Sequence, residues 1–290
     1  MLDQITPLIL TYNEAPNIGR TLERLRWAGG IVLVDSFSDD ETLEIASGFP
    51  QVRIYQRAFD SHGSQWNFGL KETGIITPWV LALDADYILT DELVSELDLL
   101  HPAERTSGYR ANFIYCVQGK RLRSGVYPPV TVLYRRDRAS YSQVGHTQRL
   151  CLEGKVETLL AQILHDDRKP LSRWLQSQVR YAELESGSLE ATAPASLSWP
   201  DRMRRWGIIA PPAMLFYCLI LRGGIFDGWA GFYYAFQRMT AELMLSLYLI
   251  EHSIVWSHRA GTSNQESQLL GPPPAAPKVN PPSTELKARN

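Results

Sequence analysis

Two aspartates one residue apart, Asp84 and Asp86, follow an apolar run that covers residues 79–83. Five apolar residues in a row are typical of a strand buried on both faces. If the extended chain continues through Asp86, both carboxylates point to the same side and repel each other. A divalent cation such as Mg²⁺ or Mn²⁺ would relieve that repulsion, because it prefers carboxylate oxygens and often also binds substrate phosphates. The alternative is a solvated turn in which one Asp caps the next helix.

The first hundred residues alternate between short apolar runs and helical patterns, which predicts an α/β domain with a largely parallel sheet. Strands are expected at residues 7–11, 30–35, 52–56 and 79–84, and helices at 14–28, 38–48 and 64–73. Ser38 or Asp39 is expected to cap the second helix. Ligands of such sheets bind at the carboxyl ends of the strands, where residues 12–14, Asp35 and residues 84–86 are expected to meet.

The second half of the chain has a different pattern. Antiparallel strands are expected at residues 107–125 and 129–137, and another strand at 156–167 leads through Pro170 into a long helix. We therefore predict one domain over residues 1–198, with halves at 1–100 and 101–198, then a helical region at 199–258 and a disordered tail at 259–290. The tail prediction rests on six prolines and little apolar content after residue 260.

Composition excludes some classes of protein. The net charge is -2, which gives no support for general nucleic-acid binding. Cys116, Cys151 and Cys218 lie far apart and form no CxxC pair, so we expect free thiols in a reducing compartment. The N-terminus lacks a basic leader followed by a long apolar core, so we expect no signal peptide and a cytoplasmic catalytic part.

Residues 199–258 contain two aromatic-rich apolar runs that are too short or too interrupted to be confident membrane spans. Aromatic residues near arginines are typical of helices that lie in a membrane interface. Arg202, Arg204 and Arg205 are candidates to hold lipid phosphates. We therefore expect peripheral attachment to the inner face of the cell membrane; a soluble helical subdomain or an oligomer interface is the alternative.

The order of the motifs "LTYNEAPNI", "VDSFSDDET" and "LALDADY", each at a predicted strand end, resembles glycosyltransferase family 2 over about residues 5–190. The segment "GGIFDGWAGFYYAF" further resembles relatives that glycosylate lipid-linked acceptors, such as bacterial enzymes of the lipopolysaccharide core. The resemblance implies a GT-A fold, with a mostly parallel sheet flanked by helices. It also implies an enzyme that takes a sugar from a nucleoside diphosphate sugar, with residues 1–100 as the nucleotide-sugar half and residues 101–198 as the acceptor half.

By that resemblance the donor would be bound by residues at the ends of the first, second and fourth strands and by residues of the third helix. Asp35 would bind the base, typically uracil, and Asp84 the ribose or the sugar. Asp86 would bind Mn²⁺ or Mg²⁺ between the two phosphates. The full set of donor-binding residues that it implies is Thr11, Tyr12, Asn13, Glu14, Asp35, Gln65, Asn67 and Asp84. Taken alone, Gln65 and Asn67 read as ordinary residues of a helix start.

The second half contributes further candidates. His165 stands at a predicted strand end and could be another metal ligand, since neutral imidazole suits Mn²⁺. This chain has Thr147 where the relatives have a Glu, which leaves the catalytic base open. Inversion by direct displacement needs a carboxylate or a His near the acceptor hydroxyl, and Asp166, Asp167 and His146 are the candidates.

The sequence thus predicts a metal-dependent, inverting glycosyltransferase with a UDP-sugar donor and a lipid-linked or glycan acceptor. Two alternatives belong to other classes. One is a membrane-bound sugar-nucleotide binder without catalytic activity, and the other is a phosphatase that uses the first Asp of the DxD motif as nucleophile. Ile88 and the position of the motif after the fourth strand disfavour the phosphatase.

Overall fold

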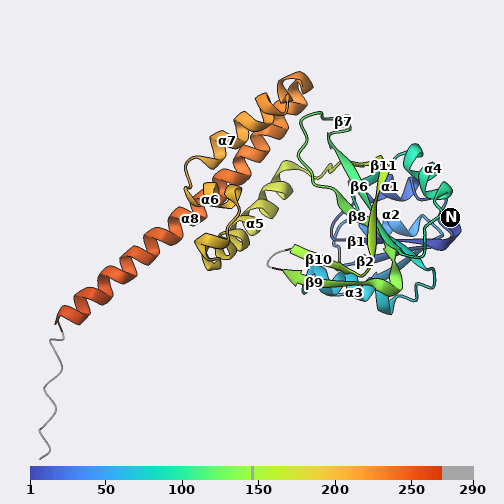
Figure 1. Ribbon diagram of the computed structural model, residues 1–290, viewed down its shortest axis with the longest axis horizontal. Coiled ribbons are helices and arrows are strands. Elements are labelled where there is room, and N and C mark those ends of the chain that lie inside the picture. Colours follow the sequence, from blue (N-terminus) through green and yellow to red (C-terminus); the bar gives the residue numbers. More distant parts are fainter. Residues whose placement is uncertain (145–146, 270–290) are drawn as a thin grey trace, which may run out of the picture. The chain divides into compact units, whose positions relative to one another are not determined.

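The computed structural model describes residues 1–144 and 147–269 (Figure 1). The main sheet consists of β1 (Ile5–Thr11), β2 (Ile31–Asp35), β3 (Val52–Gln56), β4 (Trp79–Asp84), β5 (Tyr87–Leu89), β6 (Thr106–Val117), β7 (Lys120–Arg121), β8 (Val130–Arg135) and β11 (Lys155–His165). Its order is β3-β2-β1-β4-β8-β6-β11-β5, with β7 paired to β6. β9 (Ala139–Val144) and β10 (Thr147–Leu152) form a separate antiparallel pair.

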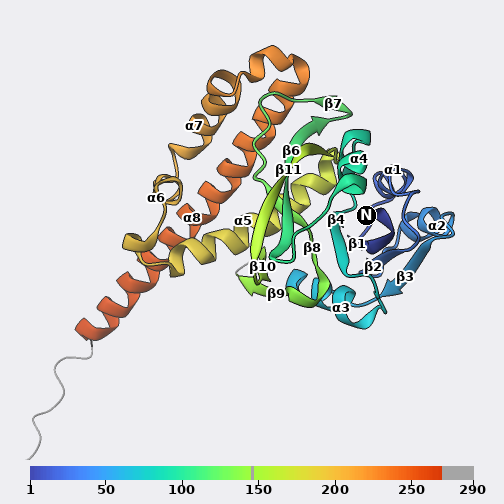
Figure 2. The same ribbon diagram turned by 45° about the vertical axis from the view of Figure 1, so that its right-hand side comes forward.

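Helices cover both faces of the sheet (Figure 2). On one face lie α1 (Ile18–Glu23), α2 (Thr42–Ser47) and α4 (Asp91–Leu99), and on the other lies α3 (His62–Glu72). The chain continues in α5 (Leu171–Ala191), α6 (Trp199–Arg205), α7 (Ala210–Phe216) and α8 (Trp229–Leu269). Successive side chains of a strand point alternately into the cores on the two faces of the sheet. In β4, Leu81 and Leu83 pack with α1, α2 and α4, whereas Val80 and Ala82 pack with α3.

The topology confirms an α/β fold whose N-terminal half is parallel. β1 pairs in parallel with β2 and β4, and β2 with β3. β8 pairs antiparallel with both β4 and β6, as expected for the second half. β11 pairs in parallel with β6, so its carboxyl end lies at the same edge of the sheet as that of β4. The residues that follow β4 and β11 are therefore brought to the same edge of the sheet.

Three local predictions are wrong. The helix expected over residues 14–28 covers only Ile18–Glu23, because residues 14–17 form a turn whose side chains reach a loop more than a hundred residues away. Neither Ser38 nor Asp39 caps α2: the helix starts after Glu41, and Ser38 instead donates hydrogen bonds to Asp35. The chain also does not stay extended through Asp86.

β4 ends at Asp84, and the chain turns at once into the short strand β5. β5 pairs antiparallel with β11, which places Tyr87 opposite His165. As a result Asp86 is 8% exposed, whereas Asp84 remains exposed at the sheet edge. The two carboxylates therefore differ in their exposure to solvent.

The contacts separate two units, Met1–Leu249 and Ile250–Asn290. In the first unit, α5 packs on the middle of α8 through Ala182, Leu189, Leu245 and Leu249. α8 continues to Leu269, past the boundary predicted at residue 258, and the rest of the predicted tail lies outside the described residues. Among the described residues, none of the helices has the length and apolar character needed to cross a membrane.

One arginine predicted to hold lipid phosphate is engaged elsewhere. Arg204 donates to Glu242, which is buried on α8, at 2.9 Å, and lies 3.3 Å from Asp201. The pair with Glu242 joins α6 to α8, and the Asp201 contact lies within α6. The guanidinium of Arg204 is thus already paired within the protein, and its contact with lipid phosphate stays a prediction.

Candidate active site

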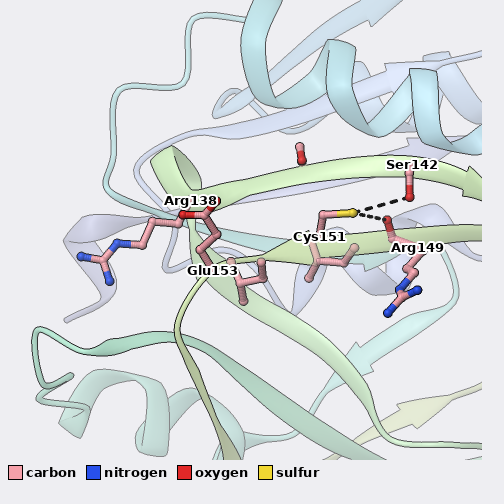
Figure 3. Close-up of a pocket in the computed structure, with 8 residues that line it drawn as sticks. Arg138, Ser142, Arg149, Cys151 and Glu153 are labelled. Atoms are coloured by element: carbon pink, nitrogen blue, oxygen red, sulfur yellow. Dashed lines mark hydrogen bonds between the residues drawn. The ribbon is translucent and has the colours of Figure 1, made fainter.

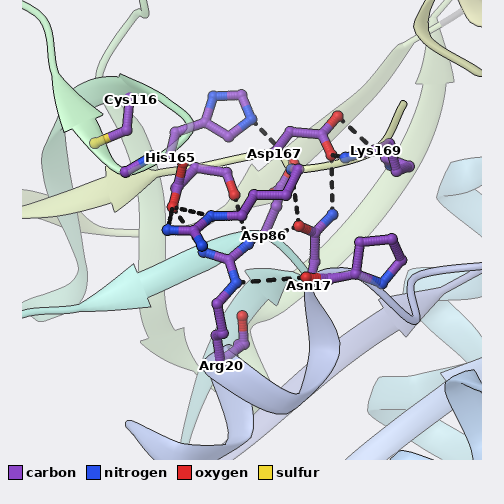
Figure 4. Close-up of polar contacts among 12 residues, drawn as sticks. Asn17, Arg20, Asp86, Cys116, His165, Asp167 and Lys169 are labelled. Atoms are coloured by element: carbon purple, nitrogen blue, oxygen red, sulfur yellow. Dashed lines mark hydrogen bonds and ion pairs between the residues drawn. The ribbon is translucent and has the colours of Figure 1, made fainter. Parts of the chain in front are cut away.

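The centre of the site is a contact between Asp86 and His165. His165 ends β11 and Asp86 follows β4, and the Nε2 atom of His165 lies 3.1 Å from Oδ2 of Asp86 (Figure 4). A backbone hydrogen bond of 3.1 Å from Asp166 to the Asp86 carbonyl holds the two segments together. Oδ1 of Asp86 and Nδ1 of His165 are buried and have no hydrogen-bond partner among the described residues.

The pKa values of Asp84 and Asp86 are shifted in opposite directions. Burial alone would raise the pKa of Asp86, but the charges of His165 and Lys169 outweigh it and hold that pKa below its ordinary value. Loss of water, followed by repulsion from Asp86, raises the pKa of Asp84 to about 6, although its side chain keeps contact with solvent. The site therefore combines a carboxylate whose ionised form is favoured with one whose pKa is raised to about 6.

A second group of polar contacts joins the end of β1 to the loop after β11. Nζ of Lys169 lies 2.7 Å from Oε1 of Glu14 and 3.8 Å from Oδ2 of Asp167. The Asn17 amide donates to both Glu14 and Asp167, each at 2.9 Å (Figure 4). Burial opposes the charge of Lys169, but the attraction of Glu14 and then of Asp167 raises its pKa above its ordinary value. Glu14 thus supports a cation beside the aspartate pair.

Both carboxylate oxygens of Asp166 already have partners. It is 4% exposed, and its Oδ2 atom lies 2.7 Å from Arg20 and 2.9 Å from Arg168. Its Oδ1 atom accepts the backbone N–H of Gly119 at 2.9 Å. This geometry argues against Asp166 as catalytic base, because both oxygens already serve ion pairs and a loop contact.

Asp167 is better placed. It is half-buried, and its Oδ1 atom accepts from Asn17 and from the backbone of Lys169, which leaves Oδ2 with only the distant Lys169 ammonium among the described residues. His146, the third candidate, lies outside the described residues.

The donor residues predicted at the ends of β1 and β2 are largely bonded to one another. Asp35 is 0% exposed, and it accepts from Thr11, from Ser38 twice and from Gln56. Asn13 is buried with a φ of 55°, and its side chain accepts from the backbone N–H of Asp39. These contacts shape the loop after β2. A contact between Asp35 and a base would require one of its partners to move.

Tyr12 lies beside this loop and is 54% exposed, so its ring is available to a ligand. The two residues predicted from α3 are not. Gln65 is 1% exposed and bonds Ser36 and Arg57 through both ends of its amide. The amide of Asn67 donates to and accepts from the backbone of Tyr141, at 2.8 Å and 2.9 Å. Their polar groups hold α3 to neighbouring segments, and their role in donor binding stays a prediction.

Aromatic side chains surround the ring of His165. Tyr127, Tyr115 and Tyr87 lie with ring centroids 4.6, 4.8 and 5.6 Å from it, all in edge arrangements. The hydroxyls of Tyr87 and Tyr127 are 2.6 Å apart. Sequence reasoning missed Tyr115, Tyr127, Lys169, Arg20 and Asn17. Of these five residues, Lys169 stands close in sequence to a predicted site residue, His165, and this could have marked it as a candidate.

The residues present suit a divalent cation that is shared with a ligand. Asp86 offers a buried oxygen without a protein partner among the described residues, and His165 offers an imidazole. No third His, Cys, Asp or Glu joins them within the described parts of the chain. Mg²⁺-type sites often have only one or two carboxylates and take their other ligands from phosphates and water. Asp86 and His165 would therefore hold the ion, and the ligand would complete its coordination.

A separate hollow lies on the β9–β10 pair (Figure 3). It has a volume of about 470 Å³, and Arg138, Arg149, Glu153 and the exposed thiol of Cys151 are among the residues that line it. None of the predicted site residues belongs to it. Because its walls lack the carboxylates and the histidine described above, we place the candidate active site at Asp86 and His165.

Comparisons with known proteins bear on the family of the chain. Residues 8–147 match the model of the family described as "Glycosyl transferase family 2". The chain is 25% identical over 246 residues to the lipopolysaccharide core biosynthesis glycosyltransferase LpsC of Rhizobium meliloti, which covers 79% of this chain and 85% of that protein. It is also 25% identical over 148 residues to an uncharacterized glycosyltransferase of Rickettsia prowazekii, with 49% of each chain covered. The chain thus spans about half the length of the Rickettsia relatives that it matches.

Among solved structures, the chain is similar to a mannosyltransferase of Pyrobaculum calidifontis in complex with GDP-Man and Mn²⁺. The TM-score is 0.49 and the identity 13%, with 85% of this chain and 87% of that chain covered. A likeness this weak carries no inference about donor or metal. The matched segment contains β1 through β9 together with Asp35, Asp84 and Asp86 at the strand ends. The chain therefore carries a domain of glycosyltransferase family 2.

Proposed function

We propose that this protein is a metal-dependent glycosyltransferase that takes a sugar from a nucleoside diphosphate sugar, with UDP as the nucleotide. The observation that carries the proposal is the meeting of Asp86 and His165, from β4 and β11, at the carboxyl edge of the sheet. Among the described residues, the buried Oδ1 atom of Asp86 has no partner and is therefore available to a cation. The positive charge of Lys169 acts on the same site and would attract a diphosphate. The membership of residues 8–147 in the family supports the same reaction.

The leaving group of such a reaction is a nucleoside diphosphate, on which negative charge grows in the transition state. Mn²⁺ or Mg²⁺ held by Asp86 and His165 would neutralise that charge. Lys169 would add a fixed positive charge on the same side, kept protonated by Glu14. Asp84, exposed at the edge, would accept hydrogen bonds from hydroxyls of the ribose or of the sugar.

Asp167 is the base that we propose for direct displacement with inversion. Asn17 and the Lys169 backbone fix its Oδ1 atom, which orients Oδ2 for the proton of an acceptor hydroxyl. General bases must lie within hydrogen-bond reach of the proton that they remove. The loop after β11 brings Asp167, a half-buried carboxylate with an available oxygen, close to His165.

We further propose that the acceptor is lipid-linked or part of a cell-envelope glycan, and that the protein binds the inner face of the membrane through α6–α8. Trp199, Trp206, Phe226 and Trp229 are 59–81% exposed in this region. Exposed apolar surface of this kind marks an interaction site. Co-flotation with anionic vesicles tests this attachment: Trp206→Ser combined with Phe226→Ser should reduce it, and a wild-type chain that stays soluble as a defined oligomer would contradict it.

The transfer itself is tested by incubating the protein with Mn²⁺, a panel of radiolabelled nucleotide sugars and a membrane lipid extract. We expect label from a UDP-sugar to enter the lipid fraction, and Asp167→Asn to abolish that transfer while UDP binding persists. Binding of UDP without transfer or donor hydrolysis in wild type would indicate a non-catalytic binder. Release of phosphate from small phosphoesters, lost in Asp84→Asn, would indicate a phosphatase.

A further inference from the structure

The loop of residues 122–128 places an aromatic ring on the proposed metal ligand. Tyr127 of this loop lies 4.6 Å from the His165 ring between centroids, and its hydroxyl lies 2.6 Å from that of Tyr87. The loop belongs to no helix or strand, so the sheet ladder does not hold Tyr127 in place. Its position must be fixed by other contacts.

Asp227 supplies the first of these contacts. It ends the 3₁₀ turn Gly224–Asp227 ahead of α8 and is 4% exposed. Its carboxylate accepts the backbone N–H groups of Arg123 and Ser124, each at 3.0 Å to Oδ2, and the Ser124 hydroxyl at 2.7 Å. Backbone N–H groups donating to a buried carboxylate are strong, charge-assisted bonds, so Asp227 pins the start of the loop.

Tyr234 supplies the second contact, one step closer to the site. Its hydroxyl accepts the N–H of Val126 at 2.9 Å and donates to the carbonyl of the same residue at 3.3 Å. Val126 directly precedes Tyr127. The ring of Tyr234 also lies 4.7 Å from that of Tyr115, which itself lies 4.8 Å from His165. Tyr234 therefore contacts the ring of Tyr115 and the backbone of the residue that precedes Tyr127.

The segment that carries Asp227 is itself tightly fixed. A Cβ atom on Gly231 would lie 2.0 Å from the Gly224 carbonyl oxygen and 2.9 Å from Cβ of Asp227. Gly228, which follows Asp227, has a φ of 62° and a ψ of -142°, a conformation essentially restricted to glycine. Close backbone approach at these glycines gives Asp227 one position relative to α8.

We propose that Asp227 and Tyr234 are positioning residues, which hold Tyr127 and Tyr115 against His165 and so fix the orientation of the His165 ring. They connect the helical region proposed to meet the acceptor with the ligand of the proposed metal. The inference rests on the proposed function for its catalytic consequence, but the orientation of His165 can be measured without catalysis.

The test uses the intact chain with histidine-selective ¹³C labelling. The sequence has six histidines, and the resonance of His165 is the one that disappears in His165→Gln. Ring currents from the surrounding tyrosines give it a distinctive shift, which Tyr127→Ala should change. We expect Asp227→Asn and Tyr234→Phe to move the same resonance in the same direction. Each variant removes a side-chain group that bonds the loop, an acceptor oxygen in the first and a hydroxyl in the second, while the side chain keeps nearly the same volume.

Two matched controls separate positioning from general damage. Tyr233→Phe alters the neighbouring, more exposed tyrosine, and Asp137→Asn alters an exposed aspartate of the 3₁₀ turn Arg136–Arg138. Both should leave the His165 resonance unchanged. An unmoved resonance in folded Asp227→Asn and Tyr234→Phe would overturn the proposal, and the milder Tyr234→Phe keeps it testable if Asp227→Asn does not fold.

Kinetics give the second readout. In Asp227→Asn and Tyr234→Phe, kcat should fall roughly 10- to 100-fold, and the donor KM in Mn²⁺ should rise, because one of the two proposed metal ligands is misplaced. Unchanged kcat in both variants would contradict the positioning role. Absence of transfer by the wild-type chain would instead refute the proposed function, and the His165 resonance would still decide the structural inference.

Discussion

Asp86→Asn should separate the stability of this protein from its ligand binding. Asp86 is 8% exposed and its Oδ1 atom has no protein partner among the described residues. An unsatisfied buried acceptor costs about 1–3 kcal/mol, and more when it is charged. The substitution keeps the shape, removes the charge and loses the attraction to His165. Because these effects oppose each other, we expect the free energy of unfolding without ligand to change by no more than about 1 kcal/mol.

The ligand-bound protein should respond differently. A ligand present at 100 times its dissociation constant stabilises the native state by about 2.7 kcal/mol. For a chain of this size that corresponds to a rise in Tm of roughly 5–10 °C. Wild type should show this rise with Mn²⁺ and UDP together, and Asp86→Asn should show little or none, because it lacks the carboxylate that would hold the ion.

Calorimetric melting of both proteins, with and without Mn²⁺ plus UDP, measures all four values. Asp137→Asn serves as the control for loss of an exposed carboxylate and should behave as wild type. A loss of more than about 3 kcal/mol without ligand would show that Asp86 is a structural residue, since breaking a buried ion pair costs that much. Full stabilisation of Asp86→Asn by Mn²⁺ and UDP would refute its assignment as a ligand.

Three further variants follow from the contacts. Arg20→Gln should lower the free energy of unfolding by about 2 kcal/mol in urea titration, since Asp166 keeps only its partly exposed partner Arg168; no loss would show that the pair is not stabilising. Asn67→Ala should lower the free energy of unfolding by about 1–3 kcal/mol, because the backbone of Tyr141 loses both of its bonds to the amide, and it should leave UDP affinity unchanged. Weaker UDP binding at unchanged stability would instead support a role of Asn67 in donor binding. Binding of UDP with Mn²⁺ should weaken as pH falls through about 6, where Asp84 gains its proton, and Asp84→Asn should flatten that profile; an identical profile would contradict this cause.

The sequence was informative wherever a local pattern has a physical meaning. Continuous apolar runs placed β1, β2 and β4 correctly, since strands buried on both faces cannot carry charge. The same reasoning placed polar residues at the carboxyl edge, where Asp84, Asp86 and His165 are found together. Pairing of β11 with β6 was not predicted, because register depends on partners distant in the sequence.

Which polar groups are already occupied could not be read from the sequence. Asp166 and Asp167 are adjacent, yet Arg20, 146 residues away in the chain, neutralises the first, and Asn17 orients the second. Gln65 and Asn67 resemble ligand-binding amides until their backbone partners are known. The turn at residues 85–86 likewise depends on β5 finding β11, which a period-two pattern does not contain.

Calorimetric titration of the intact protein with UDP, in the presence and in the absence of Mn²⁺, tests the central claim most directly. The site at Asp86 and His165 offers only two donors to the ion among the described residues, so metal and diphosphate should each need the other to bind well. We therefore expect UDP to bind with Mn²⁺ and to bind far more weakly without it. UDP binding that is absent under both conditions, or equally strong under both, would contradict a metal-dependent nucleotide-sugar site.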